Sequence, residues 1–256
     1  MITTGVDLAT EPSKTGMATL RWGSDGAVVT DLRLGVDDAA IVDATATSTK
    51  VGIDCPLGWP DGFVEMLTRH HTGHLEPHAL DDADWRRGLA NRATDVAVTR
   101  ATGLRPLSVA ADRIGLTAMR TANLLGRLAA EGSPVDRAGT GVVVEVYPAA
   151  SLRRWRLPHR GYKGNASTDA LEMVVDDLTS AAPWLRLGEY EHLCRRRDDA
   201  LDAVVAALTA RAAALGLTKA PDADDVAPAR REGWIAVPTV DLDALLPGRA
   251  AHSASG

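Results

Sequence analysis

The stretch from Arg195 to Leu208, RRRDDALDAVVAAL, constrains the fold more than any other part of the chain. Its spacing predicts a helix from Asp198 to about Leu215, and beyond its first turns this helix carries almost no polar side chain. A helix that is apolar around most of its circumference has to be buried. We therefore expect it to lie in the core, anchored against a sheet.

Three aspartates stand at the head of this buried helix. Asp199 and Asp202 are three residues apart and share one face, which continues into the apolar stripe. A buried carboxylate is costly unless it is paired, hydrogen-bonded or bound to a metal. Taken alone, the segment is also explained by capping, in which Asp198 caps the helix and its neighbours complement the positive end of the dipole.

The composition describes an ordinary globular protein. The chain has 256 residues, of which 45% are hydrophobic, and these are mostly Ala, Val and Leu. Cys55 and Cys194 show no disulfide spacing, which is typical of reduced thiols, and no leader or membrane-spanning run is present. We therefore expect a cytoplasmic protein without a membrane partner. The net charge of −6 argues against a protein that coats nucleic acid by bulk attraction.

The order of predicted elements indicates a single α/β domain. A buried strand ending near Asp7 precedes two strands joined by a turn at Gly23 to Gly26, then a helix and a short strand containing Asp54. A long polar and helical stretch of about 61–138 looks inserted, and it includes one long helix over 108–132. The other predicted elements are a strand over 140–148, a helix over 168–182 and the last helix. We expect one domain over 1–240 and a C-terminal tail over 241–256.

Three of the predicted strands each carry one lone acid, namely Asp7, Asp54 and Glu145. Acids are depleted in strands, and a buried charge needs a partner. If the first, fourth and fifth strands are neighbours, their acids converge with those of the last helix. Such carboxylates repel one another unless a cation offsets their charge, and Mg²⁺ and Mn²⁺ prefer oxygen ligands. We therefore predict a metal site in which Asp7 bridges two ions, with Asp54 on one and Asp199 or Asp202 on the other.

The sequence resembles a known family at several points. The order of elements is similar to the ribonuclease-H-like fold, a mixed sheet of three antiparallel and then parallel strands with flanking helices. DALDA, from Asp199 to Ala203, is similar to Holliday-junction resolvases of the RuvC type. The closest resemblance, from Gly5 to about Pro238, is to the domain of unknown function 429 family. It rests on GVDLA, VGIDCPLGWP, RATD, TGLRPLSVAADRIG, VEVYPAA, YKG, DDALDAVVAALTA and EGWIAVP.

The members of this family are described as predicted ribonuclease-H-like nucleases. The resemblance implies a divalent-metal-dependent nuclease whose acidic centre consists of Asp7, Asp54, Glu145, Asp199 and Asp202. The chain departs from the resolvase pattern at its fourth strand, where the acid is Asp rather than Glu and a large insertion follows.

Two basic segments are candidates for substrate binding. The run from Arg153 to Lys163 carries five cations, no acid, and the rings of Trp155 and Tyr162, a pattern that suits a polyanion. In NRATD, Arg92 would grip a phosphate while Asp95 orients it. Each segment also has a purely structural explanation. The first is explained by a solvated basic loop, and the second by a surface ion pair or a helix cap at Thr94.

Three further features are weaker candidates. Tyr147 is either a substrate contact or a boundary residue, and Glu232 is a minor candidate in a segment that otherwise packs on the sheet. The histidines His70, His74 and His78 are four residues apart, but Gly73 and Pro77 interrupt any helix there, which favours a solvated loop.

We therefore expect a Mg²⁺- or Mn²⁺-dependent phosphodiester hydrolase acting on DNA or RNA, with dimer formation left open. Two alternatives remain. The first is a nucleotide-dependent phosphotransferase of related topology, although the chain holds only one copy of GVDLA. The second is a non-catalytic domain that binds a metal or nucleic acid through the same acids.

Overall fold

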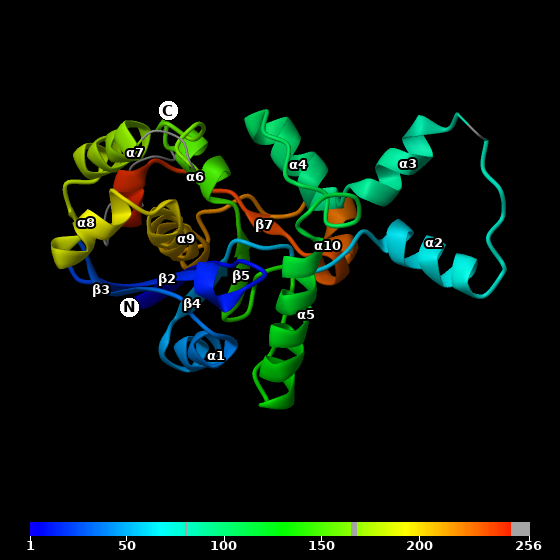
Figure 1. The fold of residues 1–256 in the computed structure, drawn as a ribbon, viewed down its shortest axis with the longest axis horizontal. Coiled ribbons are helices and arrows are strands. Elements are labelled where there is room, and N and C mark those ends of the chain that lie inside the picture. The colour runs from blue at the N-terminus through cyan, green and yellow to red at the C-terminus, as the bar shows by residue number, and fades with distance from the viewer. Residues whose placement is uncertain (80, 165–167, 247–256) are drawn as a thin grey trace.

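A mixed sheet of seven strands runs through the computed structural model, which describes residues 1–79, 81–164 and 168–246 (Figure 1). The strand order is β6-β3-β2-β1-β4-β5-β7. The strands are β1 (Ile2–Asp7), β2 (Gly16–Trp22), β3 (Ala27–Leu34), β4 (Lys50–Ile53), β5 (Val143–Val146), β6 (Leu185–Arg186) and β7 (Ile235–Ala236).

The pairing places the acid-bearing strands side by side. β1, β2 and β3 are antiparallel, whereas β4, β5 and β7 follow β1 in parallel. Val6 pairs with Ile53 and Ile53 with Glu145, so the ends of β1, β4 and β5 lie at one edge. This confirms the expected α/β class and the adjacency of the first, fourth and fifth strands. The arrangement is consistent with a ribonuclease-H-like fold.

The helix α9 (Asp198–Ala214) packs across the sheet, with its backbone in close contact with the backbone of β1. Every residue from Ala200 to Ala212 is buried, as its apolar composition predicts. Gly5 in β1 makes the approach possible, because a Cβ atom there would lie 2.1 Å from the carbonyl oxygen of Ala203 and 2.2 Å from the nitrogen of Ala207. Gly52 in β4 faces the same helix at Ala206. The sheet and the helix therefore meet backbone to backbone.

Helices cover both faces of the sheet (Figure 1). On one face α9 lies with α6 (Pro148–Arg154), α7 (Thr168–Ala181) and α8 (Glu191–Cys194), over the larger apolar core. On the other face α1 (Asp38–Thr47) and α5 (Gly115–Ala130) enclose a second core that includes Val6, Ile53 and Leu124. No helix in the described ranges combines the length and the apolar character needed to cross a membrane.

Within the described residues, the predicted insertion is helical as expected and forms four helices, of which the long one is shorter than predicted. α2 (Asp61–His71) and α3 (Ala83–Ala90) extend away from the body as an arm, with no buried residue in either (Figure 1). α4 (Ala93–Thr102) packs back against α6 and α10 (Val226–Glu232). The helix expected over 108–132 begins only at Gly115. The Asp112 carboxylate accepts a hydrogen bond from the Ser108 nitrogen, and this turn competes with the helix.

The C-terminal part differs from the expectation in two ways. β6 and β7 are strands of only two residues, too short for an alternating pattern to reveal, and β7 falls in the segment expected to pack on the sheet. The domain boundary expected at residue 240 is too early. Leu242 and Leu245 are buried in the larger core, so the packed body reaches Leu246. The rest of the expected tail, 247–256, lies outside the described residues.

Gly5→Ala tests the contact between α9 and the sheet. We expect the variant to lose about 3 kcal/mol of unfolding free energy, because the added methyl group meets helix backbone that cannot move aside. Urea unfolding followed by circular dichroism measures the change. Gly126→Ala in α5 is the matched control, since no atom lies within 4 Å of the added carbon. It should be stabilised by up to about 1 kcal/mol, and equal stability of the two variants would contradict the prediction.

Candidate metal centre

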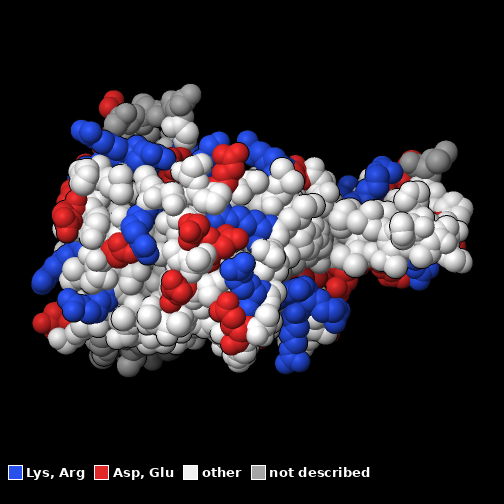
Figure 2. Space-filling view, turned by 60° about the horizontal axis from the view of Figure 1, so that its bottom comes forward, with Lys and Arg blue, Asp and Glu red and all other residues white. Residues whose placement is uncertain are grey.

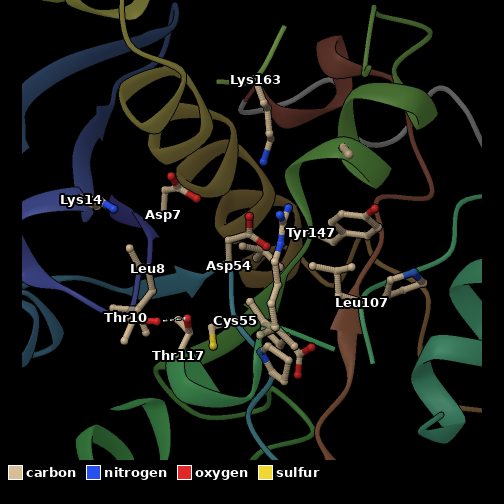
Figure 3. A pocket seen from close by; sticks show the side chains of 18 of the residues that line it. Asp7, Leu8, Thr10, Lys14, Asp54, Cys55, Leu107, Thr117, Tyr147 and Lys163 are labelled. Atoms are coloured by element: carbon tan, nitrogen blue, oxygen red, sulfur yellow. Dashed lines mark hydrogen bonds between the residues drawn. The ribbon is translucent and has the colours of Figure 1, made fainter. Parts of the chain in front are cut away.

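Three carboxylates meet at the edge where the parallel strands end. Asp7 ends β1, Asp54 directly follows β4, and Asp202 lies one turn into α9. Each offers an oxygen, and these oxygens all lie within 4.8 Å of one another. Figure 3 shows Asp7 and Asp54 directed into a pocket in front of α9. The sheet and α9 thus each contribute to one acidic group, as the isolated acids in the sequence predicted.

Local structure explains why these three side chains meet. The Asp54 nitrogen donates a hydrogen bond to the Val6 carbonyl, which extends the parallel pairing by one step and sets Asp54 beside Asp7. Asp202 directly precedes Ala203, the residue whose carbonyl touches Gly5. The close approach of α9 therefore fixes the third carboxylate against the first strand.

The three carboxylates differ in their partners. Asp202 accepts a hydrogen bond from the Tyr162 hydroxyl at 2.8 Å and pairs with the Lys163 ammonium at 2.5 Å. The side chains of Asp7 and Asp54 have no hydrogen bond or ion pair within residues 1–79, 81–164 and 168–246. A half-buried carboxylate without a partner is costly in free energy. Two of the three acids are therefore open to a ligand.

Burial and mutual repulsion raise the pKa values of Asp7 and Asp54. Burial raises the pKa of Asp7 well above its usual range, and the charges of Asp202 and Asp54 add to the rise. Burial also raises the pKa of Asp54 to about 7, although the Lys163 ammonium opposes the rise. One lysine thus offsets only part of the negative charge. A divalent cation, which prefers such oxygen ligands, would remove the remaining repulsion.

The acids line a cavity of about 1040 Å³. Besides the ends of β4 and β5, its wall includes the loop after β1, the stretch from α4 to the start of α5, and the segment that follows α6. Thr10 in the loop after β1 and Thr117 at the start of α5 are joined by a hydrogen bond, visible in Figure 3. The cavity is large enough for a substrate to reach the carboxylates.

Glu145 does not join the three aspartates. It lies in β5, and its buried carboxylate accepts two hydrogen bonds from the Arg92 guanidinium and another from the Leu57 nitrogen. This corrects the expectation that Glu145 belongs to the acidic centre. Its charge is neutralised by a buried guanidinium, so nothing is left for a metal ion to offset.

Arg92 is likewise not placed to grip a phosphate. Its side chain is 1% exposed, and all five of its guanidinium N–H groups donate, to Asp95, Glu145 and the Glu232 carbonyl. Asp95 is held by Arg92 and cannot orient a substrate. The structural alternative of a surface ion pair is wrong as well, because the pair of Arg92 and Asp95 is buried. Thr94 accepts a hydrogen bond from the Ile235 nitrogen instead of capping a helix.

Glu232, the minor candidate, belongs to the same buried framework, by which we mean the hydrogen-bonded group of Arg92, Asp95, Glu145 and Glu232. Its two carboxylate oxygens accept hydrogen bonds from the nitrogens of Asp61 and Ala93, each at 2.8 Å. These are the first residues of α2 and α4, so a single carboxylate stabilises the positive ends of two helices. The insertion, the sheet and the C-terminal helix are joined at this point.

The other two aspartates of the opening segment have local partners. Asp199 pairs with Arg197 at 2.8 Å and is not in the three-carboxylate group. Asp198 is the first residue of α9 rather than its cap, and its carboxylate accepts a hydrogen bond from the Gly164 nitrogen at 2.7 Å. That bond draws the segment carrying Tyr162 and Lys163 onto the head of the helix. Asp198 thus positions the partners of Asp202.

The basic run from Arg153 to Lys163 divides between two places. Arg160 and Lys163 line the cavity with the acids, whereas Arg153 lies on a separate groove beside Gly103 and contacts His159. Trp155 is buried in the core and offers no ring for stacking. Tyr162, also expected to be free, is buried against Asp202. Its role was missed because a ring among cations looks like a stacking platform.

The histidine tract forms no metal group among the described residues. His70 lies in the last turn of α2, and the ring of His78 stacks on Trp85 in the arm with 4.3 Å between centroids. His70, His74 and His78 are all exposed, as expected for a solvated segment, although His70 is helical.

Comparison with known proteins gives one match. A family model described as "Protein of unknown function (DUF429)" matches residues 5–226. No curated protein and no solved structure matches the chain.

Arg92→Lys tests the buried framework. A lysine cannot replace the five donors, which leaves Glu145 and Asp95 short of partners. We expect a loss of about 3–5 kcal/mol in unfolding free energy, measured by urea titration. Arg33→Lys, at an exposed pair with Asp31, is the control and should change stability by less than about 0.5 kcal/mol. A loss in the control as large as in Arg92→Lys would refute the framework role.

A second prediction concerns pH and metal. Because the pKa of Asp54 is raised from 3.8 to about 7, the folded protein binds more protons than the unfolded one. The unfolding free energy of the metal-free protein therefore falls as pH rises from about 4 to about 7. In EDTA, the melting temperature should fall less over this range for Asp54→Asn than for the natural chain. Mn²⁺ should raise the melting temperature more at about pH 8 than at about pH 5, since its ligands must be deprotonated. Identical pH profiles for both proteins would count against the assignment.

Proposed function

The chain belongs to the DUF429 family, and we propose from its site that it is a divalent-metal-dependent phosphodiester hydrolase, a nuclease. One observation carries the proposal. Asp7 and Asp54 face a large cavity without partners in the described ranges, beside a third carboxylate held by a lysine and a tyrosine. Acids in this state suit a bound cation, and the cations on the cavity wall suit an anionic substrate.

The donor set fits Mg²⁺ or Mn²⁺. Asp7, Asp54 and Asp202 offer hard oxygen ligands from rigid elements, with no sulfur or imidazole among them. When bound, such an ion lowers the pKa of water and stabilises charge on phosphoryl oxygens. Asp199, expected as a ligand, stays with Arg197, so the proposal assigns the metal to the other three aspartates.

The chain's own residues have distinct parts in this proposal. The Tyr162 hydroxyl and the Asp198 carboxylate fix the orientation of Asp202 and its lysine. Lys163 holds a positive charge at the mouth of the acidic group, where the negative charge of a phosphodiester accumulates. The substrate in this proposal is DNA or RNA, and the compartment is the cytoplasm.

Asp7→Asn and Asp202→Asn test the activity. Each should reduce Mg²⁺- or Mn²⁺-dependent cleavage of DNA or RNA by at least about a hundredfold, because each removes a negative ligand from the group. Cleavage is measured on labelled oligonucleotides in gels. Asp31→Asn, which alters only an exposed pair with Arg33, should cleave as the natural chain does.

Metal binding is measured separately by calorimetry with Mn²⁺. Binding that both variants lose, together with cleavage by the natural chain alone, supports the proposal. Undiminished cleavage by both variants would refute it. Retained Mn²⁺ binding without turnover on any nucleic acid would favour a non-catalytic domain. Stabilisation by ATP with Mg²⁺ would favour a phosphotransferase.

A further inference from the structure

Four cations line the acidic cavity with side chains that have no partner among the described residues. Lys14, Arg105, Arg113 and Arg160 all line it, and all four are exposed. Their side chains make no hydrogen bond or ion pair to another described residue. Several other surface cations are paired, as Arg231 is with Asp61 and Arg195 with Glu191. Unpaired cations gathered around one cavity indicate an anionic ligand that extends over several groups.

These cations come from three separate segments. Lys14 lies in the short turn after β1, Arg105 and Arg113 lie between α4 and α5, and Arg160 follows α6. They therefore line the cavity from different parts of the chain instead of belonging to one basic run. On the face displayed in Figure 2, Lys and Arg are interspersed with Asp and Glu, with no continuous basic field. Such local charge suits a ligand that enters the cavity better than one that lies along the surface.

The same cavity has an apolar wall. Tyr147 directly follows β5 and is half-buried, while the nearby loop presents Leu107, which is 44% exposed. Figure 3 shows both across the pocket from Lys14, with Asp7 and Asp54 between. Leu116, 63% exposed, adds a further apolar side chain at the cavity. A ring and apolar side chains beside free cations are the groups that bind a base and its phosphates.

We infer that the cavity binds an unpaired nucleic-acid strand, with phosphates at Lys14, Arg105, Arg113 and Arg160 and a base against Tyr147 and Leu107. The inference rests on the proposed nuclease function and specifies its substrate. In a duplex the bases are stacked and paired, so a base face cannot reach the wall of a cavity. An unpaired strand presents base faces and phosphates together.

Fluorescence anisotropy in EDTA tests the inference without cleavage. The probes are a labelled single-stranded oligonucleotide and a blunt duplex of the same sequence and length. We expect the single strand to bind at least about tenfold more tightly. Its affinity should fall with salt with a log–log slope of about −3, since four phosphate contacts contribute about −0.7 each.

The variants separate base from phosphate contacts. Tyr147→Ala should weaken single-strand binding by about tenfold or more without changing the salt slope, and Tyr147→Phe should restore binding. Arg105→Ala and Arg160→Ala should each reduce the magnitude of the slope by about 0.7. Arg33→Ala, at an exposed pair outside the cavity, is the control and should leave both affinity and slope unchanged.

Equal or tighter binding of the duplex, no binding of either probe at low salt, or unchanged binding by Tyr147→Ala would overturn the inference. These results are distinguishable from failure of the proposed function. Single-strand binding that responds to the variants, without cleavage in Mn²⁺, supports this inference and refutes the nuclease. Metal-dependent cleavage of duplex alone supports the nuclease and refutes this inference.

Discussion

The close contact between α9 and β1 is the constraint on which the rest of the structure depends. Gly5 gives up a side chain so that the helix backbone at Ala203 can touch the strand. Asp202 directly precedes Ala203 in the helix, so its carboxylate is held against those of Asp7 and Asp54 by the packing itself. The apolar remainder of α9 buries its whole circumference and prevents the helix from moving away from the strand ends.

A second constraint is the buried framework around Arg92, which does not include the three aspartates. Arg92 joins Glu145 of the sheet to Asp95 of the insertion, and the carbonyl of Glu232 completes its set of acceptors. Buried charges of this kind are tolerated only when every donor and acceptor is satisfied, and here the guanidinium is saturated. The framework keeps the cavity wall next to the strand ends, while the carboxylates of Asp7 and Asp54, which have no partner in the described part of the chain, remain accessible.

The sequence predicted the features that depend on patterns along the chain. Lone acids in apolar strands identified Asp7 and Asp54, and the apolar helix identified Asp202. Glu145 matched the same pattern. An acid that binds a metal and an acid that pairs with a buried arginine have the same sequence pattern, and only the folded structure shows that Arg92 is the partner of Glu145. Arg92 looked like a phosphate ligand for the same reason. Tyr162 and Trp155 were misjudged because burial of a ring depends on tertiary packing, not on its charged neighbours.

The two hydrogen bonds of Glu232 bear on the order of events during synthesis. Its carboxylate caps α4 at Ala93, 139 residues earlier in the chain, and α2 at Asp61, 171 residues earlier. A chain made from its N-terminus can form the hairpin of β2 and β3 early, since that contact is local. The insertion can already be tied to the sheet by Arg92 and Glu145, but the Glu232 bonds have to wait until α10 has left the ribosome. The nitrogens of Asp61 and Ala93 therefore gain their Glu232 acceptor only late in synthesis.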